Sequence, residues 1–273
     1  MKIEAYAKIN LTLEVLGKRP DGYHELKSIV CPVSLSDSLT VEKALETSSN
    51  TPFADDLCVK AAKVMGLGAK ISVEKRIPTG GGLGGGSADA AAVMIALNEI
   101  YGLGLSPDKL AEKGSLVGSD VPSLILANIF SSAVLMEGRG ERVRPLAKAK
   151  LNFVLVDPAV HSSTAEVFSK WKDIGVPSKI SEPSLAAEDA LSSGDIEALS
   201  KVISNDLSLP SSFLHPEISN ALDMLSRENV LAASVTGSGS CLFALVSSHE
   251  EAIRITQALR LKGVRAFAIS SLS

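Results

Sequence analysis

The sequence predicts an α+β fold in two domains, residues 1–149 and 150–273. Its 273 residues are close to the length at which one hydrophobic core divides into two. With 45% hydrophobic and 21% charged residues, the composition is that of a globular protein that can bury a large core. Both halves mix strand-like and helical patterns without an internal repeat, and a new apolar strand at 151–156 (LNFVLV) opens the second half.

Strand patterns open the first half. Alternating apolar residues predict strands at 3–15, 24–33, 38–43 and 70–78, with shorter ones at 133–136 and 142–146 around a turn at 138–141 (GRGE). Apolar residues at helical spacing predict helices at 55–65, at 87–102 after Ser87, at 107–116 after the cap Ser106, and from the segment 118–122 (GSDVP) onward.

The second half is predicted to be mostly helical. After the strand at 151–156, helical patterns occupy 164–172, 185–192, 196–204 and 216–228. Two apolar strands, 231–235 and 242–246, bracket the segment 236–240 (TGSGS). A capping box at 248–251 starts a helix that runs to about residue 262, and a last strand covers 264–269.

A glycine run at 80–86 (GGGLGGG) is the strongest functional signal. Glycine costs chain entropy in a folded loop, and packing alone is not expected to require six in seven residues. The run lies between a predicted strand and a predicted helix, whereas flexible linkers have polar, disordered flanks. Backbone N–H groups and the positive end of the helix dipole would together bind a polyphosphate.

Two other nucleotide-binding patterns fit less well. A P-loop requires Lys and then Ser or Thr after the last glycine, but Ser87 and Ala88 follow Gly86. The dinucleotide pattern GxGxxG is met only because the run is nearly all glycine. The acid at the expected distance, Glu99, lies inside the predicted helix instead of ending a strand.

Composition argues against several classes of partner. The formal net charge is −4 and no basic stripe is present, which disfavours nucleic acid or an anionic membrane as a partner. Cys31, Cys58 and Cys241 are widely spaced and form no metal-binding or disulfide pattern. Without an apolar N-terminal signal or a membrane-spanning stretch, a cytoplasmic location is expected.

Five motifs in order along the chain carry a family resemblance. They are AKINL with Lys8 and Asn10, DGYHEL at 21–26, PTGGGLGGGSADAAAV at 78–93, GSDVP at 118–122 and TGSGS at 236–240. Together they resemble the GHMP kinase superfamily over nearly the full length. Within it they are similar to the branch that phosphorylates 4-diphosphocytidyl-2-C-methyl-D-erythritol in non-mevalonate isoprenoid biosynthesis.

The resemblance implies a fold, a cofactor and a site. The N-terminal domain would be ribosomal-protein-S5-like and the C-terminal domain ferredoxin-like, with the site in the cleft between them. ATP and Mg²⁺ would be used, although no acidic cluster marks the metal ligands. The partner would be a small-molecule substrate, and the protein would be a monomer or a homodimer.

The resemblance also assigns roles to individual residues. Lys8 and Asp120 match the catalytic pair: the carboxylate would accept the proton of the substrate hydroxyl, and the ammonium would stabilise charge on the transferred group. Taken alone, Lys8 would be a solvated lysine and Asp120 a helix cap. The residues expected to bind ATP are Pro78, Gly80, Gly81, Gly82, Leu83, Gly84, Gly85, Gly86 and Ser87. The residues expected to bind substrate are Asn10, Tyr23, His24, Thr164, Phe168, Thr236, Gly237 and Ser238.

The substrate end of the predicted site depends on aromatic residues. By the resemblance, Tyr23 and Phe168 would stack on the two faces of cytosine and His24 would hydrogen-bond its edge, with stacking worth about 1–3 kcal/mol per base. Alone, Tyr23 and His24 would be a strand-edge aromatic and a surface histidine. TGSGS alone could be a glycine-rich hairpin.

Some residues depart from the family pattern. Ala88 replaces a serine after the glycine run, Asp56 stands near a usual asparagine of the adenine pocket, Ser119 replaces an alanine, and Ser123-Leu124 replace a phenylalanine. These changes bear on the adenine contacts more than on the reaction.

Three alternative functions stay open. The same fold could phosphorylate homoserine, mevalonate or another alcohol, although a base-binding aromatic pair would then have no use. A nucleotide-binding regulator would not need Lys8 and Asp120, and a nicotinamide oxidoreductase would need dinucleotide binding.

Overall fold

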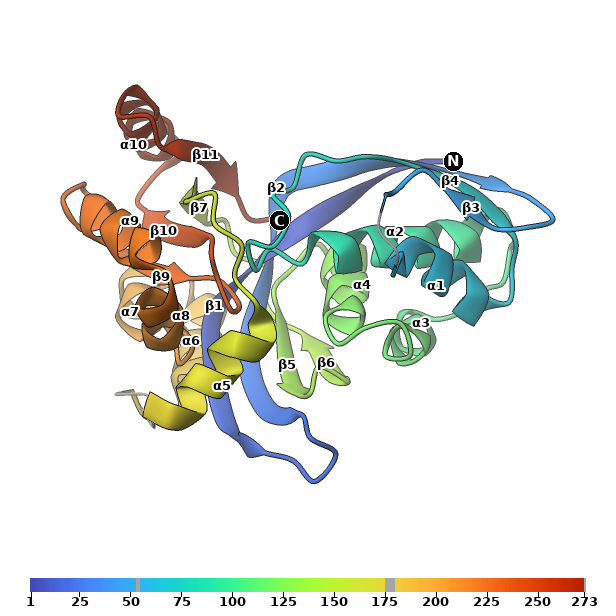
Figure 1. The fold of residues 1–273 in the computed structure, drawn as a ribbon, viewed down its shortest axis with the longest axis horizontal. Coiled ribbons are helices and arrows are strands. Elements are labelled where there is room, and N and C mark those ends of the chain that lie inside the picture. Colours follow the sequence, from blue (N-terminus) through green and yellow to red (C-terminus); the bar gives the residue numbers. More distant parts are fainter. Residues whose placement is uncertain (53–54, 175–179, 273) are drawn as a thin grey trace.

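The chain folds into two β-sheets, each covered by helices, that lie side by side (Figure 1). The computed structural model describes residues 1–52, 55–174 and 180–272. Within them the sheets have seven and four strands, and helices lie against both, as the α+β prediction requires.

The first sheet is built on one long hairpin. β1 (Lys2–Lys18) and β2 (His24–Lys43) pair antiparallel from Lys2↔Thr40 to Lys18↔His24. Separate strands were predicted at 24–33 and 38–43, and this is wrong. The register between the two strands shifts near Pro32. Because β1 runs beside the whole length of β2, however, β2 continues through this irregularity as one strand.

Short strands complete this sheet along the other edge of β2. β4 (Ala69–Glu74) pairs with the C-terminal part of β2 and β5 (Val134–Gly138) with its N-terminal part. β3 (Ser48–Ser49) joins β4, and β6 (Arg142–Pro145) joins β5. On the far side, β8 (Ser204–Asn205) pairs in parallel with β1. Because β8 comes from the second half of the chain, the division near residue 150 stays a prediction.

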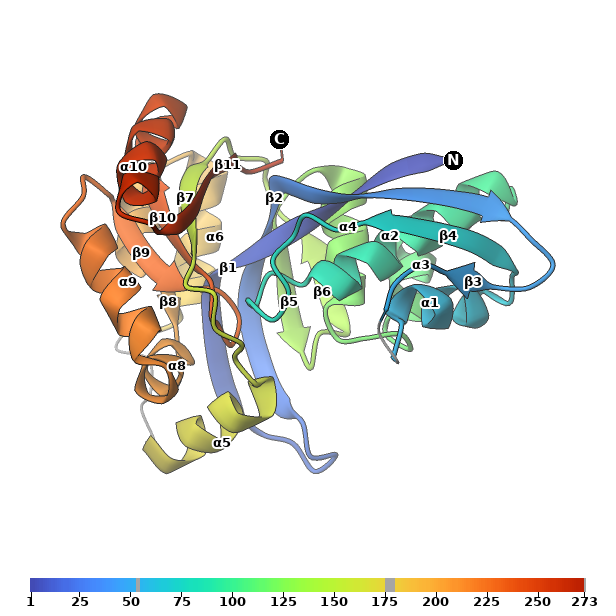
Figure 2. The ribbon, with the colours of Figure 1, turned by 45° about the horizontal axis from the view of Figure 1, so that its top comes forward.

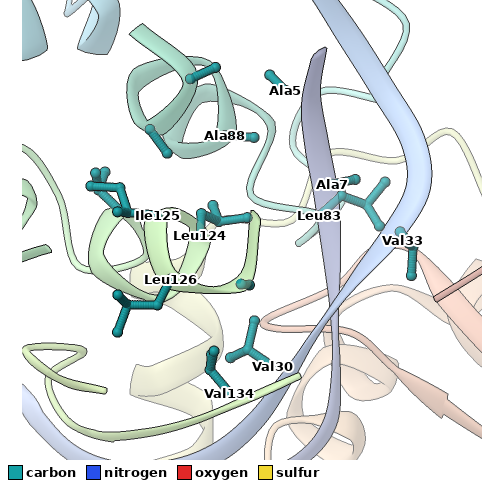
Figure 3. Close-up of a cluster of buried hydrophobic side chains, with 14 of the residues drawn as sticks. Ala5, Ala7, Val30, Val33, Leu83, Ala88, Leu124, Ile125, Leu126 and Val134 are labelled. Atoms are coloured by element: carbon teal, nitrogen blue, oxygen red, sulfur yellow. The ribbon is translucent and has the colours of Figure 1, made fainter. Parts of the chain in front are cut away.

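Four helices cover the first sheet: α1 (Leu57–Met65), α2 (Gly85–Ile100), α3 (Pro107–Gly114) and α4 (Val121–Phe130). The alanines of α2 allow close packing, and the helix lies between β1 and α4 with Ala88 fully buried. Figure 3 shows Ala88 near Ala5 of β1, with Leu124 and Ile125 of α4 in the same cluster. Small side chains thus bring the start of α2 close to the sheet.

The second sheet has the order β11–β7–β10–β9, with all neighbours antiparallel. Its strands are β7 (Asn152–Asp157), β9 (Ala232–Val235), β10 (Leu242–Val246) and β11 (Arg265–Ser270). The first and third strands in chain order are therefore central, which is the ferredoxin-like arrangement that the resemblance implied. α9 (Pro216–Ser226) and α10 (His249–Leu261) pack on one face (Figure 2).

The opposite face of this sheet joins the core of the first. Phe153 and Phe243 meet edge to face at 5.8 Å and belong to the same buried cluster as β1 and α2. The remaining helices are α5 (Thr164–Ile174), α6 (Pro183–Ser193), α7 (Ile196–Val202) and α8 (Ser208–Leu214). Among the described residues, no helix has the length and apolar character needed to span a membrane.

Candidate active site

A cleft of about 1480 Å³ opens where loops of the two sheets meet. It is lined by β1, the β1–β2 turn, the glycine run, the start of α4, and the loops before α5 and β10. Every predicted site residue lines it except Thr236, which is fully buried behind it. The structure therefore brings together segments that are up to 230 residues apart, as Lys8 and Ser238 are.

The first three glycines of the run are required by packing. A Cβ on Gly82, where φ is +75°, would lie 2.1 Å from the carbonyl oxygen of Thr236. A Cβ on Gly81 would lie 2.4 Å from the Cys241 Sγ, and one on Gly80 2.2 Å from a ring nitrogen of His161. The expectation that packing does not need this run is wrong here, because the loop is pressed against two loops of the second sheet.

The last three glycines form the start of α2. The helix begins at Gly85, two residues before the predicted first residue Ser87, and its N-cap Gly84 has φ +69° and no side-chain cap. The Gly86 position is open, since a Cβ there would meet only Leu57, at 3.7 Å. The first N–H groups of α2 thus lack a capping side chain and lie at the cleft, as an anion site requires.

Lys8 and Asp120 face each other across the cleft. The Nζ of Lys8 lies 3.7 Å from Oδ2 of Asp120, with 5% of the lysine side chain and 36% of the aspartate side chain exposed. Asp120 directly precedes α4, but its side chain makes no capping hydrogen bond. Asp120 thus occupies the N-cap position without capping the helix through its side chain, and the carboxylate is available to a ligand.

Asn10 holds Lys8 in place. Its Oδ1 accepts a hydrogen bond from the Lys8 Nζ at 2.7 Å, and its Nδ2 donates to the Ser28 Oγ at 2.8 Å. The Thr236 hydroxyl accepts from the backbone N–H of Asn10 at 3.1 Å. Asn10 is 2% exposed, so in this arrangement its amide positions the lysine, while a direct contact to substrate stays a prediction.

The turn at 236–240 is tied to the loop before α5. The Ser238 carbonyl accepts hydrogen bonds from Ser162 at 2.8 Å and from Ser211 at 2.6 Å. The hydroxyls of Ser238 and Thr164 lie 2.9 Å apart. Gly237 lies next to Gly82, so the turn also contacts the glycine run. These bonds fix the cleft wall that carries Thr164 and Ser238.

The aromatic group differs from the predicted pair of stacking rings. His24 stacks on Phe168 with ring centroids 4.4 Å apart and planes at 17°, and Trp171 contacts His24 edge to face at 5.8 Å. Tyr23 is 51% exposed. Burial, together with the charge of Lys18, lowers the pKa of His24, which favours the neutral ring. A Tyr23–Phe168 sandwich is thus not preformed, and Trp171, three residues beyond Phe168, was missed.

Sequence reasoning also missed a charged cluster beside the glycine run. Lys75 pairs with Asp89 at 2.7 Å and with Asp37, and both Lys75 and Asp89 line the cleft. Burial raises the pKa of Asp89 to about 7 despite the lysine. Asp56 is used in capping α1, because its carboxylate accepts from the Cys58 N–H at 2.8 Å. The position of Asp89, three residues after Gly86 and one turn into α2, was the available signal.

No group of three or more His, Cys, Asp or Glu residues that could hold a metal ion occurs in the part of the chain that the structure describes. The three cysteines are buried and unpaired, and burial raises the pKa of Cys31 to about 12. They are unreactive thiols within the core.

Comparisons with known proteins identify the family of this chain. The models of the GHMP kinases N terminal domain and of the GHMP kinases C terminal domain match residues 54–128 and 187–265. The chain is 37% identical to the 4-diphosphocytidyl-2-C-methyl-D-erythritol kinase of Symbiobacterium thermophilum, over the whole of both chains. It is 36% identical to the kinase of that name from Caldanaerobacter subterraneus, covering 99% of this chain and 96% of the relative.

A solved structure gives the same result. A crystal structure of 4-(cytidine 5'-diphospho)-2C-methyl-D-erythritol kinase matches with a TM-score of 0.83 and 31% identity over the whole of both chains. The chain belongs to the 4-diphosphocytidyl-2-C-methyl-D-erythritol kinase family of GHMP kinases. The two-domain GHMP kinase fold is thereby confirmed.

The departures from the pattern of this kinase family have structural explanations. Ala88 is fully buried, so a serine hydroxyl there would need a partner within the core. The Ser123 hydroxyl donates to the Asp120 carbonyl at 2.8 Å, which steadies the first turn of α4, and Leu124 is fully buried.

Proposed function

We propose that this protein transfers the γ-phosphoryl group of ATP to the 2-hydroxyl of 4-diphosphocytidyl-2-C-methyl-D-erythritol. The observation that supports this most is that one cleft contains a glycine-rich helix start, a lysine–aspartate pair and an aromatic group. We interpret these three features as a polyphosphate site, an acid–base site for proton transfer and a site for the nucleobase. Family membership and the full-length relatives support the same reaction.

ATP would bind with its phosphates on the start of α2. The unsatisfied N–H groups after Gly84 and the positive end of the helix dipole attract the phosphates. Ser87 lies in the same first turn of α2 and also lines the cleft. No side-chain cap competes for these donors, so they are available to the phosphates.

Phosphoryl transfer would then depend on Asp120 and Lys8. The carboxylate accepts the proton of the attacking hydroxyl and orients its oxygen in line with the γ-phosphate. Lys8, held by Asn10, stabilises the negative charge that develops on the transferred group. A fixed ammonium contributes without reorganisation, which favours the transition state over the bound substrate.

The nucleotide end of the substrate would lie against Tyr23, His24 and Phe168. The neutral His24 has one ring N–H and one acceptor nitrogen, which suits the polar edge of cytosine. The His24 ring covers one face of Phe168, so that face can stack on the base only if the His24 ring moves away. If it does not move, Tyr23 would supply the stacking alone.

Mg²⁺ is expected to accompany ATP. Magnesium typically binds through one or two carboxylates, phosphate oxygens and water, and neutralises phosphate charge when bound. The cleft fits this mode because Asp120 and Ser87 line it, and the described residues contain no group of three or more His, Cys, Asp or Glu that could form a metal cage. We place the enzyme in the cytoplasm as a monomer or homodimer, consistent with three unpaired cysteines.

A substrate comparison tests the proposal. Measured kcat/KM with ATP should be highest for the full nucleotide substrate and far lower for homoserine, mevalonate and 2-C-methyl-D-erythritol 4-phosphate. Equal phosphorylation of the fragment without the nucleotide would rule out the base site. Transfer to homoserine or mevalonate alone would instead indicate another alcohol kinase.

A further inference from the structure

The turn between β5 and β6 carries a cation that the proposed reaction has not used. Arg139 is half-buried and lines the cleft. Among the described residues, its guanidinium makes no ion pair, and its side-chain contact is with the face of Tyr23, 5.1 Å from the ring centroid. By contrast, Lys8 and Lys75 are paired with carboxylates. The charge of Arg139 contributes to lowering the pKa of Asp21, but the carboxylate of Asp21 is hydrogen-bonded to Arg19 and forms no ion pair with Arg139. The half-buried guanidinium is therefore available to an anionic ligand.

The turn holds the Arg139 backbone firmly. The register Leu26↔Gly138 places the turn beside the start of β2. The Glu141 carboxylate accepts the backbone N–H of Arg139 at 2.7 Å. A Cβ on Gly140, where φ is +116°, would lie 2.1 Å from the Ser119 carbonyl oxygen. The turn thus rests directly on the residue before Asp120.

Arg139 therefore lies between the two ends of the proposed site. Its side chain is on Tyr23, at the base end, and its turn is packed on Ser119, at the acid–base end. In the nucleotide substrate, a diphosphate joins the base to the alcohol that is phosphorylated. If the base and the reacting hydroxyl occupy these two ends, the diphosphate must pass between them.

We propose that Arg139 binds the diphosphate of the nucleotide substrate and is a specificity residue for nucleotide-linked alcohols. The proposal rests on the proposed function. A planar guanidinium with five N–H donors suits bidentate binding of phosphate oxygens, and stacking on Tyr23 orients its plane. Lys18 and Lys172 also line the cleft, but both are exposed and less constrained.

Ligand pairs that differ only in the diphosphate test this role. Binding of CDP and of cytidine is measured by calorimetry for the wild type, Arg139→Gln and Arg139→Lys. We expect Arg139→Gln to weaken CDP binding at least tenfold while cytidine binding changes little, since a charge-assisted hydrogen bond is lost. Arg139→Lys should recover part of the loss. In kinetics, the loss should appear in KM for the nucleotide substrate and not in KM for ATP.

Arg144→Gln is the matched control. Arg144 lies on the same hairpin but pairs with Glu188 at 2.6 Å and does not line the cleft, so its variant should bind CDP as the wild type does. Equal losses of CDP and cytidine in Arg139→Gln would mean that the arginine only supports Tyr23, and would overturn the proposal. Unchanged CDP binding would also overturn it. A wild type inactive on the nucleotide substrate would refute the proposed function instead.

Discussion

Gly86→Val separates the ligand role of the glycine run from its packing role. A Cβ at this position meets only Leu57, at 3.7 Å, and the backbone is helical. Glycine and valine differ by about 0.5 kcal/mol in helix propensity, so the free energy of unfolding should change by no more than about that amount. The branched side chain would nevertheless stand beside the N–H groups that are proposed to bind phosphate. We expect ATP to bind at least about tenfold more weakly, a loss of about 1.4 kcal/mol.

Gly82→Ala, by contrast, should lower the free energy of unfolding, because packing requires a glycine at this position. Its Cβ would lie 2.1 Å from the Thr236 carbonyl oxygen, at a φ of +75°. The left-handed conformation alone costs about 1–2 kcal/mol for a residue with a Cβ, and displacing the neighbouring turn adds to it. Calorimetric titration with ATP and urea unfolding should be carried out on both variants. If Gly86→Val is folded and binds ATP normally, the phosphate site does not lie at the start of α2 and the reasoning fails.

Four further variants test the other parts of the site. Asp120→Asn and Lys8→Ala should each lower single-turnover rates by about 10²-fold or more with substrate binding largely kept, and a near-normal rate in Asp120→Asn would exclude the carboxylate as proton acceptor. Tyr23→Ala should weaken nucleotide binding by about 1–3 kcal/mol in the same titrations, whereas undiminished binding would contradict a stacking role. Because the pKa of Asp89 is raised from 3.8 to about 7, the native state keeps a proton that the unfolded chain loses, so stability falls as pH rises through this window. Asp89→Asn should therefore gain stability relative to the wild type between pH 5 and pH 8 in urea unfolding, and a constant difference would show that Asp89 does not titrate there.

The local patterns of the sequence predicted most of the elements. The strand at Leu242–Val246 was placed with its observed bounds, because its apolar run is flanked by clear turn residues. The helix α8 was missed because Pro210 and three serines give it little helical character, and tertiary contacts decide its conformation. β8 has only two residues, and its pairing with β1 bridges almost 200 positions, so no local signal marks it.

The individual residues of the site could be predicted from the sequence, but the contacts between them could not. The motifs identified Lys8, Asp120 and the glycine run, since each carries a local residue pattern. The role of Asn10 in holding Lys8, and the stacking of His24 on Phe168, depend on side-chain geometry between distant segments. The packing need for Gly82 likewise arises from a loop that lies about 150 residues away.

The most direct test of the central claim is to identify the reaction product by ³¹P NMR. The wild type is incubated with ATP, Mg²⁺ and 4-diphosphocytidyl-2-C-methyl-D-erythritol. We expect ADP and an intact nucleotide that carries one new phosphate monoester on the 2-hydroxyl. Hydrolysis of ATP without a new ester, or transfer to another position, would contradict it.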